Sequence, residues 1–181
     1  SLLIEPIIKF VSKKTKLKAR KRASDIAQEL LRLYALRELK EGFAFNKDDE
    51  NQIMFESEFP YDETSDQLKS ISAIKLEMEK AKPMDMLLCG DVGYGKTEVA
   101  FRAIFKAIND GKQVAYLCPT TILSNQQYKS ALERFQNFSC NIGLLNRFVP
   151  KKKQDEIVQK VKEGKIDLLF GTHRILSNDI E

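Results

Sequence analysis

The chain has 181 residues, 43% of them hydrophobic and 31% charged, a composition typical of a globular protein that can bury a core. No stretch approaches the roughly 18 apolar residues of a membrane span, and the apolar start SLLIEP has no basic residues before it, so we expect neither a membrane span nor a signal peptide. The net charge of +4 is uneven, because residues 1–41 hold 11 Lys or Arg against 5 Asp or Glu.

Three cysteines, Cys89, Cys118 and Cys140, lie in apolar, strand-like runs, and none belongs to a C-x-x-C pair. This placement predicts reduced core thiols rather than disulfide bridges or metal ligands. Reduced thiols favour a cytoplasmic location.

Residues 1–12 form a short apolar piece interrupted by Pro6, which we interpret as the tail of a preceding domain or a linker. The pattern of basic and apolar residues over 13–42 predicts one long, basic, amphipathic helix. Seven of the ten residues in Lys13–Arg22 are Lys or Arg, and apolar residues then recur at three- and four-residue spacing up to Gly42. The basic first turn opposes the helix dipole, so these lysines do not stabilise the helix. They are either solvated charge or a surface for nucleic acid or polymerase.

Residues 43–62 read as an aromatic-rich connector. Its aromatic residues are Phe43, Phe45, Phe55, Phe59 and Tyr61. A helix follows, and Thr64 and Gln67 fit the capping box at its start. In the alternative interpretation, Gln67 bonds the edge of an adenine ring while Phe59 or Tyr61 stacks on its face. Spacing alone leaves both interpretations open.

The apolar run Met84–Cys89 predicts a strand, and it leads into GDVGYGKT at residues 90–97 and then into a helical pattern that ends at Gly111. The spacing G-x-x-x-x-G-K-T is that of a phosphate-binding loop. Its glycines let backbone N–H groups curl around a polyphosphate, while Lys96 reaches the phosphates and the Thr97 hydroxyl meets Mg²⁺. The start of the helix adds its positive dipole end. The alternative is a glycine-rich turn that binds nothing.

Three further apolar runs alternate with helical patterns. They are Gln113–Cys118, Asn141–Leu145 and Ile166–Phe170. With the strand before the loop, this alternation predicts an α/β fold with a parallel sheet covered by helices on both faces.

Polar residues follow each predicted strand. They lie in Pro119-Thr120-Thr121, Asn146-Arg147-Phe148 and Gly171-Thr172-His173. Because the carboxyl ends of parallel strands meet at one edge, these residues should lie together, where they can hold a nucleic-acid backbone. The simpler alternatives are a helix N-cap at Thr120 and a loop position for His173.

The motifs together resemble those of superfamily 2 helicases and translocases. Gln67, GDVGYGKT, PTTIL and GTHRIL are similar to motifs Q, I, Ia and Ic. Within that group, FPYDETSDQ, the aromatic Tyr94 and EGKIDLLFGTHRIL resemble the bacterial transcription-repair coupling factors, over residues 20–181. RecG-type branch-migration helicases rank second, because they usually carry a small residue at Tyr94 and a glutamate at Thr121.

The resemblance implies an ATP-driven motor on double-stranded DNA that displaces stalled RNA polymerase and recruits nucleotide excision repair. Residues 13–42 would be the relay helix, and residues 63–181 the first part of a RecA-like motor lobe. The implied ATP and Mg²⁺ site comprises Phe59, Tyr61, Gln67, Gly90, Asp91, Val92, Gly93, Tyr94, Gly95, Lys96, Thr97 and Glu98. Lys96 and Thr97 would be catalytic, with Thr97 on the metal. The implied DNA-facing residues are Thr120, Thr121, Arg147, Thr172 and His173.

One expected element is missing from the sequence. No apolar run ends in Asp-Glu, so the carboxylate pair that would hold Mg²⁺ and place the attacking water, the Walker B motif, is absent. We therefore predict a fragment that turns over little ATP alone, contacts polymerase and repair proteins only through other domains, and self-associates through an unpaired sheet edge. The competing hypotheses are a phosphate-loop switch without nucleic acid, and an interaction module working through the basic helix.

Overall fold

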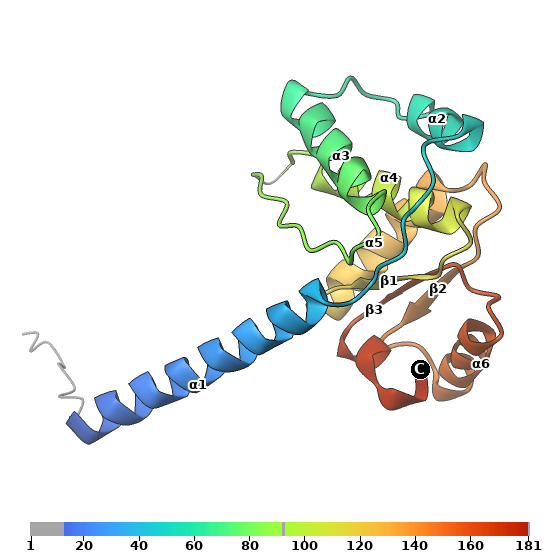
Figure 1. Cartoon of the computed structure of the whole chain (residues 1–181). Helices are drawn as coiled ribbons and strands as arrows, with labels where there is room; N and C mark the ends of the chain where they lie inside the picture. The colour runs from blue at the N-terminus through green and yellow to red at the C-terminus, as the bar shows by residue number, and fades with distance from the viewer. Residues whose placement is uncertain (1–12, 92, 181) are drawn as a thin grey trace, which may run out of the picture. The chain divides into compact units, whose positions relative to one another are not determined.

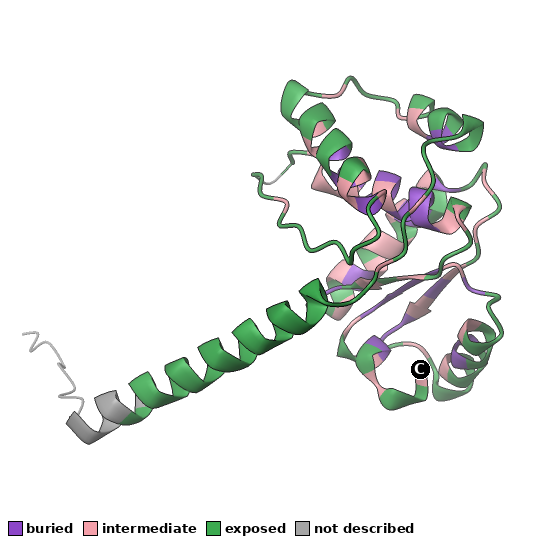
Figure 2. Ribbon diagram, viewed as in Figure 1, coloured by how far each residue is buried: buried purple, intermediate pink, exposed green. Residues whose placement is uncertain are grey.

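A computed structural model of the protein describes residues 13–91 and 93–180, so the prediction for residues 1–12 lies outside the described residues. The chain divides into two units, 1–42 and 43–181. In the first unit, helix α1 spans Lys13–Glu38, which confirms a long helix that ends four residues earlier than expected. Its described apolar side chains are exposed, Leu31 to 68% (Figure 2). No helix in the described residues is long and apolar enough to cross a lipid bilayer.

The second unit is built on a parallel sheet of three strands, β1 (Val114–Leu117), β2 (Ile142–Leu145) and β3 (Leu168–Gly171), in the order β1-β3-β2 (Figure 1). The register aligns Gly171 with Leu117 on one side and with Leu145 on the other, so all three strands end in one row. The α/β class and the parallel sheet predicted from the sequence are confirmed.

Helices cover both faces of this sheet because the strand residues alternate in direction. Leu168 and Phe170 of β3 pack in one core cluster with α4 (Lys96–Asn109) and α5 (Thr121–Arg134). Leu169, between them, packs in another cluster with α6 (Lys151–Lys162) and the short 3₁₀ helix η1 (His173–Leu176). A second 3₁₀ turn, η2 (Asn178–Ile180), follows. The predicted two-sided cover is therefore confirmed (Figure 1).

The strand predicted over Met84–Cys89 is wrong. In the described part of the chain β1 pairs with β3 alone, and residues 84–91 form no strand. The side chain of Leu87 is 86% exposed, whereas Leu88 packs against α3 (Ser65–Met78) and α4. An apolar run becomes a strand only where a partner strand takes its N–H and C=O groups. Cys89 is consequently exposed rather than in the core, while Cys118 is buried.

The connector 43–62 contains a helix that the sequence analysis did not predict, α2 (Glu50–Ser57). Asp49 caps it by accepting a hydrogen bond from the Gln52 N–H at 3.0 Å. The side chain of Phe55 is fully buried, stacked on Phe105 of α4 with ring centroids 4.3 Å apart. Two helical turns are too few to show a 3.6-residue period, which explains why the pattern was missed.

Asp48, just before α2, makes stability depend on pH. It accepts hydrogen bonds from Lys106 Nζ at 2.8 Å and Lys75 Nζ at 2.5 Å. Burial alone would raise the pKa of Asp48, but these bonds outweigh it and hold the pKa below its usual value. A carboxyl with a lowered folded-state pKa stabilises the fold above its unfolded pKa of about 3.9, and this stabilisation is lost as the pH falls through the folded value.

We therefore expect Asp48→Asn to lower the free energy of unfolding at pH 7, and the gap from the unmodified protein to narrow below about pH 4. Urea denaturation at several pH values between 3 and 7 measures this. Asp155→Asn, which removes an exposed partner of Lys151, is the control and should have a small effect throughout. A gap for Asp48→Asn that does not change with pH would contradict the assignment.

Candidate functional site

The loop before α4 has the backbone geometry of an anion cradle. Gly93 and Gly95 have φ angles of +84° and +69°, in the left-handed region that glycine occupies without strain. Gly95 is the N-cap of α4, so it leaves the first turn of the helix uncovered by a side chain. The N–H groups and the dipole of this helix end attract negative charge. Val92, a predicted member of the loop, lies outside the described residues.

Lys96 lies folded over this loop. Its Nζ donates to the backbone oxygens of Gly90 at 2.5 Å and Asp91 at 2.6 Å. These carbonyl groups hold the ammonium at the loop, where phosphate oxygens can replace them as acceptors. A charged acceptor makes the stronger hydrogen bond, so the exchange favours an anion.

Gln67 caps α3 and also contacts the loop. Its Oε1 accepts from the Thr64 N–H at 2.7 Å and its N–H donates to Thr64 Oγ1 at 3.3 Å, which confirms the capping box. Its Nε2 donates to the Tyr94 backbone oxygen at 2.8 Å, inside the loop. A Cβ on Gly95 would displace that Nε2 from its place, and the left-handed φ of Gly95 also favours glycine there. Gln67 therefore fastens α3 to the loop.

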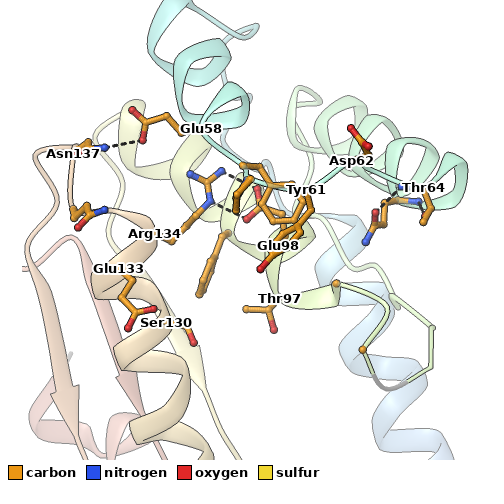
Figure 3. Close-up of a pocket in the computed structure, with 17 residues that line it drawn as sticks. Glu58, Tyr61, Asp62, Thr64, Thr97, Glu98, Ser130, Glu133, Arg134 and Asn137 are labelled. Atoms are coloured by element: carbon orange, nitrogen blue, oxygen red, sulfur yellow. Dashed lines mark hydrogen bonds and ion pairs between the residues drawn. The ribbon is translucent and has the colours of Figure 1, made fainter.

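A cavity of about 1100 Å³ lies between the loop, the connector and α5 (Figure 3). Of the predicted nucleotide residues, it is lined by Phe59, Tyr61, Gln67, Gly93, Gly95, Thr97 and Glu98. The rings of Phe59 and Tyr61 meet edge to face, with centroids 5.5 Å apart, and we call this pair the aromatic rim. Gly90, Asp91, Tyr94 and Lys96 stand in the loop beside the lining. Its volume lies slightly above the usual range of small-molecule sites, about 300–1000 Å³.

Glu98 forms ion pairs with two arginines that were not predicted from the sequence. It is 7% exposed, and its carboxylate accepts from Arg102 Nε at 2.9 Å. It also accepts from Arg134 Nε and Nη2 at 2.9 and 2.8 Å (Figure 3). Burial lowers the pKa of Arg102, but hydrogen bonds to Glu98 and Glu63 raise it above its usual value, so Arg102 stays charged. The spacing of four between Glu98 and Arg102 could have indicated their pair, whereas no local pattern indicates Arg134.

The strand-end residues gather at a second place. Because β1, β2 and β3 end in one row, Thr120, Arg147 and Thr172 follow at one edge of the sheet. Thr120 is the N-cap of α5, and its Oγ1 accepts from the Leu123 N–H at 3.2 Å, which confirms the cap. A hydroxyl that accepts this bond can still donate its hydrogen to another acceptor. Arg147 is exposed, with its guanidinium 5.1 Å from the Phe148 ring centroid.

The remaining strand-end residues differ in exposure. Thr121 and Thr172 are half-buried, and His173 is exposed at the start of η1. Hydroxyl and guanidinium groups at such an edge can bond phosphate oxygens without selecting a base. The expected fourth strand end, before the loop, does not join this row, because residues 84–91 lie outside the sheet in the described structure.

The fold and its sequence are similar to those of known proteins. The family model for DEAD/DEAH box helicases matches residues 64–181. The transcription-repair-coupling factor of Bacillus subtilis (strain 168) is 56% identical over 168 residues, which cover 93% of this chain and 14% of that protein. The same-named protein of Staphylococcus aureus (strain USA300) is 52% identical over 169 residues. The chain thus spans about a seventh of the length of these relatives.

A solved structure of RecG bound to a three-way DNA junction has a TM-score of 0.77 and 31% identity to this chain. It covers 83% of this chain, which covers 21% of the RecG chain. This likeness agrees with the RecA-like helicase fold that the motifs predict.

Proposed function

Since the chain belongs to the DEAD/DEAH box helicase family, we propose that it supplies the nucleotide-binding part of an ATP-dependent motor that moves along double-stranded DNA. The relatives at 52–56% identity, which are transcription-repair-coupling factors, support the narrower proposal that this motor displaces stalled RNA polymerase and recruits nucleotide excision repair. Contacts with polymerase and repair proteins would then lie in other regions of the longer protein.

The observation that carries the proposal is the cradle at the start of α4 beside the aromatic cavity. We assign the phosphates to the N–H groups of residues 93–97 and to Lys96 Nζ, which gives up the oxygens of Gly90 and Asp91 for them. The Thr97 hydroxyl, which lines the cavity, would hold the Mg²⁺ that arrives with ATP and neutralises phosphate charge. Gln67 and the aromatic rim would hold the adenine.

The aligned strand ends support a DNA surface on the same unit. We assign Thr120, Thr121, Arg147, Thr172 and His173 to the phosphate backbone of DNA. Most protein–DNA hydrogen bonds go to phosphate and sugar, and these residue types make them without selecting a sequence. A motor that moves along DNA needs contacts of this kind.

The test uses the longer protein that contains this chain. We expect its ATP hydrolysis to rise with double-stranded DNA, and we expect it to release RNA polymerase halted on a template. The likeness to RecG favours a second candidate, branch migration, which predicts remodelling of three-way junctions without release of polymerase. ATP binding with no response to any DNA would favour a nucleotide-dependent module instead and would refute the motor.

Gln67→Ala separates the capping role of this residue from nucleotide recognition. Its loss should destabilise α3 by about 0.5–2 kcal/mol, as for other caps, and should also reduce the preference for ATP over GTP. Thr64→Ala is the matched control, because it removes the same cap but keeps the amide that faces the loop. Titrations with both nucleotides and urea denaturation measure the two effects. If the two variants show the same preference for ATP over GTP, Gln67 acts only as a helix cap.

A further inference from the structure

We propose that Arg134 of α5, together with Arg102 of α4, positions the aromatic rim Phe59–Tyr61 and thereby sets how strongly the cavity prefers ATP to a bare polyphosphate. The inference rests on the proposed function. It adds two positioning residues that lie outside the phosphate-loop motif and outside the glutamine motif.

Arg134 is fixed from several sides. Its Nε and Nη2 donate to the two carboxylate oxygens of Glu98 at 2.9 and 2.8 Å, and Nη2 also donates to the Phe55 backbone oxygen at 2.7 Å. Its guanidinium lies 3.8 Å from the centroid of the Phe55 ring, and its side chain is only 11% exposed. Donors engaged in this way hold the side chain in place rather than reach for a ligand.

Arg102 is fixed in the same cluster. Its Nε donates to Glu98 at 2.9 Å and its Nη2 to Glu63 at 2.6 Å, with the side chain 3% exposed. The Phe59 ring centroid lies 5.4 Å from the Arg102 guanidinium and 5.9 Å from that of Arg134. Both distances fall within the range of cation–π attraction. Phe59 is therefore attracted by both arginines.

The aromatic rim needs side-chain contacts to hold its position, because it lies in a loop and not in a helix or strand. Residues 58–63 connect α2 to α3 outside either helix. Three contacts hold these residues in place. Asn137 Nδ2 donates to Glu58 at 3.1 Å, and the Phe59 ring faces the two arginines. Glu63 forms an ion pair with Arg102. Tyr61 is 72% exposed, and the Phe59 ring supports it edge to face.

Preorganisation gives the arginines their effect on binding. A base that stacks on an already ordered rim does not bear the entropy cost of immobilising it. A rim released from its anchors would have to be ordered when the base binds, so affinity for ATP falls. A polyphosphate without a base contacts the loop alone, so its affinity stays the same.

The experiment compares two ligands on the same protein. Mg·ATP and magnesium tripolyphosphate are titrated calorimetrically into the unmodified chain, Arg134→Lys, Arg134→Gln and Lys129→Gln. Lys129 is an exposed residue of α5, so Lys129→Gln controls for loss of charge on that helix. We expect Arg134→Gln to weaken ATP binding by about threefold to tenfold, the cost of ordering one or two side chains, and to leave tripolyphosphate binding unchanged. Arg134→Lys, which keeps the charge but loses the planar fork, should show a smaller loss.

A double-mutant cycle tests whether Arg134 acts through the rim. In the Phe59→Ala background, Arg134→Lys should no longer change the ratio of the two affinities, because there is no ring left to position. Circular dichroism confirms folding of each variant, and if Arg134→Gln does not fold, the Arg134→Lys pair carries the test.

The outcomes separate this inference from the proposed function. Unmodified protein that binds neither ligand overturns the proposed function. Unmodified protein that prefers ATP, with the same preference in every Arg134 variant, overturns only the positioning role. Equal losses for both ligands would assign Arg134 to general stability, which also overturns it.

Discussion

Replacement of Lys96 by alanine is expected to weaken the binding of Mg·ATP by about 10- to 150-fold, since one hydrogen bond to a charged group contributes about 1.5–3 kcal/mol. The ammonium is held by the backbone oxygens of Gly90 and Asp91, two bonds that the phosphates would replace. In the longer protein the same change should abolish the ATP-driven movement that we propose, because the charge that faces the transferred phosphate is lost.

Titration with a fluorescent ATP analogue measures the affinity, and urea denaturation checks the fold. The control is Lys152→Ala, which removes the same charge from the exposed surface of α6 and should leave affinity unchanged. Equal affinities in the Lys96 and Lys152 variants would falsify the assignment of Lys96.

Replacement of Phe55 by alanine is expected to lower the free energy of unfolding by about 3–5 kcal/mol, the usual cost of deleting a buried aromatic ring. The Phe55 ring is fully buried and meets Phe105, Phe135 and Phe138 with centroids 4.3, 4.9 and 5.2 Å away. The guanidinium of Arg134 also covers it. The helix α2 thus carries a central core residue, although its segment reads as a connector.

Urea denaturation measures this change, and Ile53→Ala is the matched control. Ile53 lies two residues away on the same helix and is 62% exposed, so its truncation should alter the free energy of unfolding by no more than about 0.5 kcal/mol. Similar small effects at both positions would show that α2 does not pack on the unit as described.

Features fixed by local chemistry were predictable from the sequence. Thr64 and Gln67 are three residues apart, so their capping box follows from spacing alone. The runs 113–118, 141–145 and 166–170 each became a strand, because each is apolar, short and bounded by helical patterns. Their parallel alignment followed from the helical crossovers between them.

Features that depend on distant partners were not predictable. The run 84–89 is as apolar as the three strands, yet it forms no strand. Strand formation depends on hydrogen bonds to a neighbouring strand, and the run's own sequence does not show whether such a neighbour exists. Glu98 and Arg134 meet across 36 residues, and their pairing depends on how α4 and α5 pack. Sequence therefore indicates the loop and its lysine, whereas the buried cluster behind the aromatic rim required the structure.

Binding of the phosphates of ATP by residues 90–97 is tested most directly by amide chemical shifts. We would titrate the ¹⁵N-labelled chain with Mg·ATP and follow the signals of Gly93, Gly95, Lys96 and Thr97. We predict saturable shifts of these amides, with tripolyphosphate causing shifts at the same residues. If Mg·ATP leaves these signals in place, or shifts only signals elsewhere in the chain, the account is contradicted.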